Sequence, residues 1–128
     1  MAGPVEIAYR FGFEAAHYFR HGPADHPYRR LHGHSFTAEV AVAGEPDPET
    51  GFVVDFTTLE QAVAELRGQR DHTLLNDVPG LAVPSLENIA GWVWERLSPR
   101  FPGLCRVTVR RPSCAQSCTY RGPRPDGP

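Results

Sequence analysis

Two stretches near the start of the chain alternate apolar and polar residues. In residues 5–18 the apolar side chains occupy every second position: Ile7, Tyr9, Phe11, Phe13 and Ala15. In the second stretch they are Phe36, Ala38, Val40 and Val42. A period of two is typical of a β-strand with one buried face. We therefore predict two strands, with His17 on the apolar face of the first and His32 and His34 on that of the second.

The pattern becomes helical after residue 56. The segment Gly44–Gly51 predicts a turn that leads antiparallel into a short third strand, Phe52–Phe56. Thr57 and Glu60 have the spacing of a helix-capping box. The apolar residues that follow recur at helical spacing: Leu59, Ala62, Val63 and Leu66. The sequence thus predicts a first helix that begins at about Thr57.

A second helix is predicted to start at Ser85, a good N-cap, and to stop before Pro99. Its apolar stripe consists of Leu86, Ile89, Ala90, Val93 and Leu97. The polar segment 70–76 between the helices is predicted to be a loop. Short alternating runs around Val107–Val109 and at Thr119–Tyr120 predict the last two strands.

These elements predict an α+β fold, an antiparallel four-stranded sheet with two helices on one face, as a single domain over residues 1–122. The Pro- and Gly-rich residues 123–128 predict a flexible tail. A small open sheet leaves strand edges that one chain cannot cover, so we expect a homo-oligomer that assembles through those edges.

Composition narrows the possible functions. The chain has 128 residues, 41% of them hydrophobic, and all 13 cationic residues are Arg, which excludes catalytic-lysine chemistry. A net charge of −2 gives no electrostatic footprint for nucleic acid or an anionic membrane, so neither is an expected partner. With no apolar run of membrane-spanning length and no signal-peptide pattern, we expect a cytoplasmic protein. Its three cysteines are expected to be reduced thiols.

Five of the six histidines fall between residues 17 and 34. His32 and His34 flank a glycine and present two imidazoles on one face of a strand, and His17 reaches the same place if the first two strands pair. Three imidazoles with an open fourth position are typical of catalytic zinc. The alternative is three separate histidines that bond to the backbone. His21 and His26 have no assigned role.

The adjacent Asp71 and His72 are a second candidate for chemistry. A carboxylate that orients an imidazole raises its basicity, as a general base requires. Taken alone, the same pair is also explained as solvated loop residues.

Together these motifs resemble the 6-pyruvoyl-tetrahydropterin synthase and 6-carboxy-tetrahydropterin synthase family, which has the T-fold. The resemblance runs in order along nearly the whole chain. It is carried by Phe13-Glu14-Ala15-Ala16-His17, Leu31-His32-Gly33-His34-Ser35-Phe36, Gly51-Phe52-Val53-Val54-Asp55-Phe56, Asp71-His72-Thr73-Leu74-Leu75-Asn76-Asp77, Pro84-Ser85-Leu86-Glu87-Asn88 and Tyr120-Arg121-Gly122.

The resemblance implies a homo-oligomer, a trimer or a dimer of trimers, with active sites between subunits. It implies Zn²⁺ held by His17, His32 and His34, with Asp71 and His72 as the Asp-His pair of a catalytic triad. The implied substrate is a small molecule, 7,8-dihydroneopterin triphosphate, whose side-chain oxygens bind zinc while proton transfers drive elimination, isomerisation or side-chain cleavage.

Two positions depart from the family's pattern. Tyr28 stands where the family has its catalytic cysteine, and its phenol either transfers a proton or only shapes the pocket. Where the family has a pterin-anchoring glutamate, this chain has Arg110 and Arg111 and no acid. A guanidinium only donates hydrogen bonds, so we assign Arg111 to substrate binding, with solvated strand-end arginines as the alternative. Ser85 matches the family's substrate-binding threonine.

Three functions follow from these observations. The departures favour a zinc-dependent lyase or cyclase of this family, which transfers a proton next to a zinc-held carbonyl or hydroxyl of a diverged substrate, pterin or non-pterin. The second is an orthodox 6-carboxy-tetrahydropterin synthase acting on 7,8-dihydroneopterin triphosphate. The third is a non-catalytic, zinc-stabilised binding subunit.

Overall fold

The computed structural model describes residues 3–18, 32–70 and 73–124. Its regular elements are the strands β1 (Val5–His17), β2 (His32–Gly44), β3 (Thr73–Leu74), β4 (Leu104–Arg111) and β5 (Gln116–Tyr120), the helices α1 (Phe56–Arg70) and α2 (Leu86–Leu97), and the single 3₁₀ turns η2 (Leu75–Asp77) and η3 (Pro112–Cys114). No helix in these ranges is long and apolar enough to cross a membrane.

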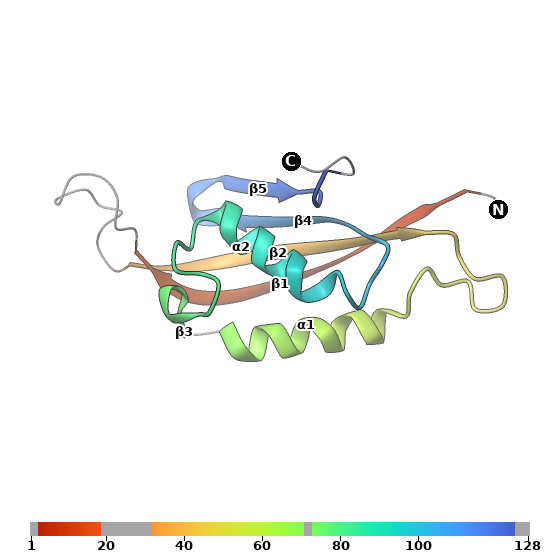
Figure 1. Ribbon diagram of the computed structural model, residues 1–128, viewed down its shortest axis with the longest axis horizontal. Coiled ribbons are helices and arrows are strands. Elements are labelled where there is room, and N and C mark those ends of the chain that lie inside the picture. The colour runs from red at the N-terminus through yellow and green to blue at the C-terminus, as the bar shows by residue number, and fades with distance from the viewer. Residues whose placement is uncertain (1–2, 19–31, 71–72, 125–128) are drawn as a thin grey trace.

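The strands form one sheet in the order β3-β1-β2-β4-β5, and both helices lie on the same side of it (Figure 1). β1 and β2 are antiparallel and in register over their full length, from the pair Val5–Gly44 to the pair His17–His32. β4 and β5 continue the antiparallel order. The predicted α+β fold with four antiparallel strands and two helices on one face is therefore confirmed.

The core lies between this sheet and the helices. The alternating residues of β1 and β2 point into it as predicted, and Phe13 stacks on Phe36 with ring centroids 5.1 Å apart. The predicted stripes of both helices are buried against them. Ser85 caps α2, because its side chain accepts a hydrogen bond from the Asn88 N–H at 3.1 Å.

The predicted third strand, Phe52–Phe56, is wrong. Residues 52–55 form no strand, and α1 begins at Phe56. The Asp55 carboxylate accepts from the Thr57 N–H at 2.9 Å, so Asp55 replaces the predicted Thr57 as the residue that satisfies the first turn. Phe52 and Phe56 remain 54% and 46% exposed.

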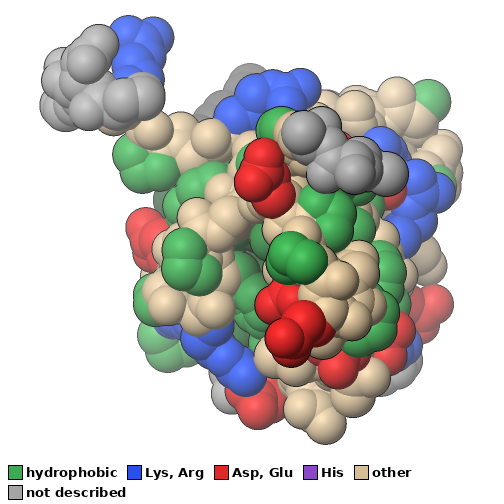
Figure 2. Space-filling view, turned by 90° about the vertical axis from the view of Figure 1, so that its right-hand side faces the viewer, with side chains coloured by type: hydrophobic (Ala, Val, Ile, Leu, Met, Phe, Trp, Pro, Cys, Tyr) green, Lys and Arg blue, Asp and Glu red, His purple; other side chains and the backbone are tan. Residues whose placement is uncertain are grey.

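Figure 2 shows apolar and acidic side chains gathered at the end of the molecule that faces right in Figure 1.

The polar loop predicted for residues 70–76 is also wrong in part. It contains β3, which pairs in parallel with Ala15 and Ala16 of β1, and it leads into η2, where Leu75 is buried. Asn76 bonds with both its side-chain oxygen and its side-chain nitrogen to the backbone of Tyr18, each at 3.0 Å. These two hydrogen bonds hold the segment against the end of β1.

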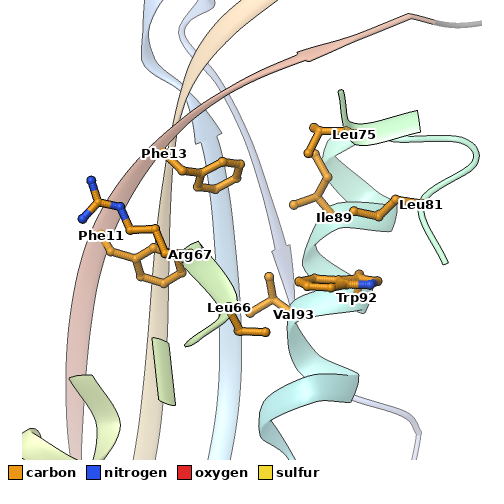
Figure 3. A pocket seen from close by; sticks show the side chains of 9 residues that line it. All are labelled: Phe11, Phe13, Leu66, Arg67, Leu75, Leu81, Ile89, Trp92 and Val93. Carbon is orange, nitrogen blue, oxygen red and sulfur yellow. The ribbon is translucent and has the colours of Figure 1, made fainter. Parts of the chain in front are cut away.

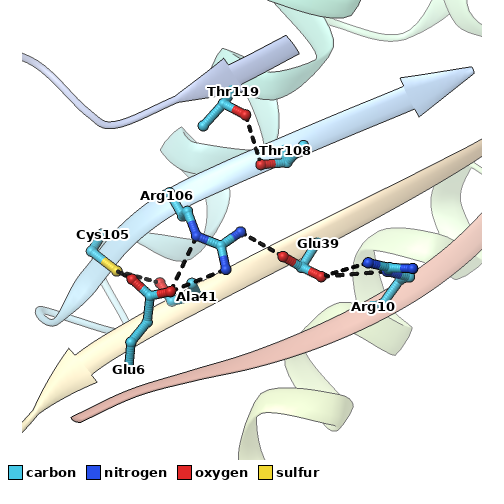
Figure 4. Close-up of polar contacts among 8 residues, drawn as sticks. All are labelled: Glu6, Arg10, Glu39, Ala41, Cys105, Arg106, Thr108 and Thr119. Carbon is cyan, nitrogen blue, oxygen red and sulfur yellow. Dashed lines mark hydrogen bonds and ion pairs between the residues drawn. The ribbon is translucent and has the colours of Figure 1, made fainter. Parts of the chain in front are cut away.

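The sheet face away from the helices is polar. Arg106 pairs with Glu6 and with Glu39, and Glu39 also accepts from Arg10 at 3.1 Å (Figure 4). The Arg106 hydrogen bond is the main cause that holds the pKa of Glu39 below its ordinary value, against an opposing effect of burial. Charged side chains thus connect three strands across this face.

The two helices leave a small apolar hollow between them and β1. Its volume is about 20 Å³, and Figure 3 shows side chains from both helices, β1 and the segment after β3 pointing towards it. The residues that line it are Phe11, Phe13, Leu66, Arg67, Leu75, Leu81, Ile89, Trp92 and Val93. The core is therefore not completely filled between the helices and β1.

Candidate functional site

Two of the predicted metal ligands come together at the end of the sheet. His17 closes β1 and is 1% exposed, and its ring meets that of His34 edge-on with centroids 5.0 Å apart. Both rings also meet Phe36 edge-on, at 5.5 Å and 5.8 Å. The backbone of His32 is the register partner of His17, and its side chain lies outside the described part.

A backbone carbonyl orients the His17 ring. Nδ1 of His17 lies 3.0 Å from the Pro84 oxygen, a contact in which the ring nitrogen donates. In the neutral imidazole the lone pair then belongs to Nε2, which is the arrangement typical of a metal-binding histidine. The His17–His34 pair, with two buried ring nitrogens Nε2 and one oriented ring, fits a zinc ion. Within the described side chains no group of three potential ligands is complete, since that of His32 is not among them.

The start of α2 is held beside these histidines. Pro84 contacts His17, and Ser85 follows directly as the helix cap, half-buried. Its oxygen accepts from Asn88, while the hydroxyl hydrogen is available for another acceptor. Asn88 in turn donates to the Val83 carbonyl at 2.8 Å, which braces the turn before the helix.

Arg110 and Arg111 end β4 at the same end of the sheet, half-buried. Arg110 is the register partner of Thr37, and Arg111 that of Gln116. Since side chains alternate along a strand, Arg111 lies on the helix-covered face with the buried Val109, and Arg110 lies on the polar face. Neither the buried Nε of Arg111 nor the buried Nη1 of Arg110 donates a hydrogen bond to a described residue.

The other predicted site residues, Tyr28, Asp71 and His72, lie outside the described residues, as do His21 and His26. The three cysteines are free thiols.

The sequence did not identify two residues that shape this end of the sheet. One is Asn76, whose polar amide directly after the apolar Leu75 is a signal for a structural hydrogen bond. The Pro84 carbonyl has no such signal, because any residue type supplies a backbone oxygen.

Comparisons with known proteins agree on one family. The model of the 6-pyruvoyl tetrahydropterin synthase family matches residues 6–123. A 6-carboxy-5,6,7,8-tetrahydropterin synthase from Synechocystis sp. is 40% identical over 89% of this chain and 91% of that protein. A dihydroneopterin monophosphate aldolase from Pyrococcus furiosus is 38% identical over 77% of this chain and 80% of its own length.

Solved structures give the same result. A Caenorhabditis elegans 6-pyruvoyl tetrahydropterin synthase superimposes with a TM-score of 0.84 at 26% identity, covering 94% of this chain and 96% of that one. The sheet and the paired helices described above are therefore the T-fold that the motifs implied. The chain belongs to the 6-pyruvoyl tetrahydropterin synthase family.

Proposed function

We propose that this protein is a zinc-dependent lyase that acts on a phosphorylated dihydropterin, as a 6-carboxy-tetrahydropterin synthase does. The observation that carries the proposal is the oriented His17–His34 pair beside the start of α2. The 40% identity to a protein of that name supports this interpretation over a diverged substrate. It is the second of the three functions that the sequence left open.

Zinc would be held by His17, His32 and His34. Bound there, zinc would supply Lewis-acid polarisation of a carbonyl or hydroxyl oxygen of the substrate. Pro84 contributes by fixing the orientation of the His17 ring, and Phe36 by packing against two of the rings.

We assign proton transfer and substrate binding to residues that the sequence motifs indicate. His72, oriented by Asp71, would move the proton at a substrate carbon next to a carbonyl, and Tyr28 would exchange a second proton. Ser85 would donate its hydroxyl hydrogen to the substrate while its oxygen stays bonded to the Asn88 N–H.

The test is turnover of 7,8-dihydroneopterin triphosphate by zinc-loaded protein, with products identified by mass spectrometry. We expect a 6-carboxy-tetrahydropterin product, a loss of about a hundredfold or more in His72→Ala, and a smaller loss in Tyr28→Phe. Full activity in His72→Ala would refute the assigned base.

Metal content gives an independent measurement. His34→Ala should lose zinc, measured by elemental analysis after dialysis, while His26→Ala serves as a matched control and should retain it. Equal zinc in both variants would refute the metal site.

One observation favours the second candidate, a family lyase with a diverged substrate. Arg111 is a cation on the helix-covered face and has no described partner. Two results together would support that candidate. The protein would bind zinc firmly without turning over the pterin triphosphate, and it would convert a different substrate in a reaction that requires His72. Zinc binding with no reaction at all would leave the non-catalytic subunit.

A further inference from the structure

Arg111 is a strand-end arginine whose backbone is held by the sheet. Its backbone is extended, with φ −110° and ψ 91°, and the next residue, Pro112, disfavours any helical alternative. Its register partner is Gln116, on the first position of β5. The direction of the side chain, towards the helix-covered face, is therefore fixed by the sheet.

That face is also the face of the histidines. Val109 and Phe36 are buried on it, and His34 lies two residues before Phe36 on β2. The ladder between β2 and β4 reaches the pair Thr37–Arg110, so Arg111 lies one step further towards the end of β2 that carries His34. The guanidinium and the imidazole pair thus belong to the same end and the same side of the sheet.

Nothing described neutralises this guanidinium. Its Nε is buried, and no described carboxylate or carbonyl accepts from it. Burial and, after it, the charge of Glu87 in the first turn of α2 raise the pKa of Cys118 on β5. Glu87 nevertheless forms no ion pair with Arg111. A buried donor that lacks an acceptor is costly, and that cost is removed when a ligand supplies the acceptor.

We propose that Arg111 selects substrates that carry an anionic oxygen group, a phosphate or a carboxylate, at this end of the sheet. This inference rests on the proposed function and names the chemistry of one part of its substrate. A planar guanidinium binds two oxygens of such a group at once, which a neutral hydroxyl does not match.

The chain provides a matched control. Arg110 has the same charge, the adjacent position, the same half-burial and likewise a buried nitrogen without a described acceptor, but it lies on the opposite face of the sheet, away from the histidines. Arg110→Gln and Arg111→Gln change the net charge equally, so any long-range electrostatic effect is the same in both. A difference between them reports contact with the ligand.

The experiment is equilibrium dialysis of zinc-loaded full-length protein with three probes: 7,8-dihydroneopterin, its triphosphate, and pterin-6-carboxylate. Arg111→Gln should weaken binding of at least one anionic probe by about tenfold or more and leave the neutral probe within about twofold. The probe that is weakened distinguishes phosphate from carboxylate. Arg111→Lys should recover part of the affinity, and Arg110→Gln should bind all three probes as the wild type does.

Equal affinities for all probes in Arg111→Gln and wild type would overturn the inference, and so would an equal loss for the neutral and the anionic probes. The measurement needs no turnover. Absence of product from the wild type with intact, Arg111-dependent binding would therefore count against the proposed reaction and not against this role of Arg111.

Discussion

Glu39 occupies the centre of the polar face, between two arginines on neighbouring strands. Its side chain is 15% exposed, and it accepts from Arg106 and from Arg10. Because the two partners come from β4 and β1, removal of this one carboxylate breaks links on both sides of β2. Its loss should therefore weaken contacts among three strands.

We predict that Glu39→Gln lowers the free energy of unfolding by about 2 kcal/mol at pH 7. The hydrogen bond from Arg106 lowers the pKa of Glu39 in the folded protein below its ordinary value of 4.5. A lowered carboxyl pKa contributes stability that is fully present above the unfolded value and is lost as the pH falls through the folded value. The difference between wild type and variant should therefore be constant from pH 7 to about pH 5 and shrink below about pH 4.

Urea unfolding at a series of pH values measures this difference. Glu65→Gln is the control, because Glu65 pairs with Arg100 at 3.0 Å but both side chains are well exposed. It should cost less than about 0.5 kcal/mol. A pH-independent difference between Glu39→Gln and wild type would contradict the assignment of the stabilisation to the charged carboxylate.

At the scale of elements, the contact between α1 and α2 is weaker than the contact of either helix with the sheet, and the small apolar hollow lies between them. Val93 lines this hollow from α2, and Leu66 lines it from α1 (Figure 3). The hollow is lined almost entirely by carbon, so an added methylene meets no polar group there.

Val93→Ile should raise the free energy of unfolding by about 0.5–1 kcal/mol, since one more methylene is buried in existing space. The matched variant Val109→Ile adds the same group to a fully buried residue that lines no described hollow, and it should be destabilising. Thermal or urea unfolding compares the two. Equal destabilisation in both would contradict the prediction, because it would mean that the hollow has no room for the added methylene.

The elements that the sequence predicted well are those with a strong internal period. β1, β2 and α2 each repeat their pattern many times, and Ser85 marks the start of α2 with its own side chain. The segment 52–56 misled because Phe52, Val53 and Val54 have strand propensity, whereas the position of Asp55 as a cap depends on one hydrogen bond. β3 has only two residues and pairs with β1 across a large sequence separation, so no local pattern reveals it.

The same distinction applies to the site. A period of two was enough to place His17 and His34 on one face, because register and alternation determine the face of every residue in a strand pair. The role of Pro84 was not predictable, since it contacts His17 through a backbone oxygen from 67 residues away.

For the molecule as a whole, the sheet of the described residues has unpaired backbone groups at both of its edges, at β5 and beside the short β3. β5 has no neighbour beyond it in the described ranges, and β1 is covered by β3 at only two residues. Unpaired strand edges favour addition of further strands from other chains. The expected oligomer, a trimer or a dimer of trimers, would pair these edges between subunits.

We therefore predict a sedimentation mass of about three or six times the 14.2 kDa of the chain, independent of concentration in the micromolar range. High salt should not dissociate the assembly, because strand pairing and apolar contacts are insensitive to screening. A species at the mass of a single chain across this range would contradict the prediction.

The ladder between β1 and β2 also restricts how this protein can change in evolution. It is continuous over thirteen residues of each strand and ends where His17 of β1 faces His32 of β2. Insertion or deletion of one residue inside either strand would turn the histidines and the neighbouring core residues to opposite sides of the sheet. Lineages of this chain should therefore vary in length at the turn of residues 45–55, while β1 and β2 diverge only by substitution.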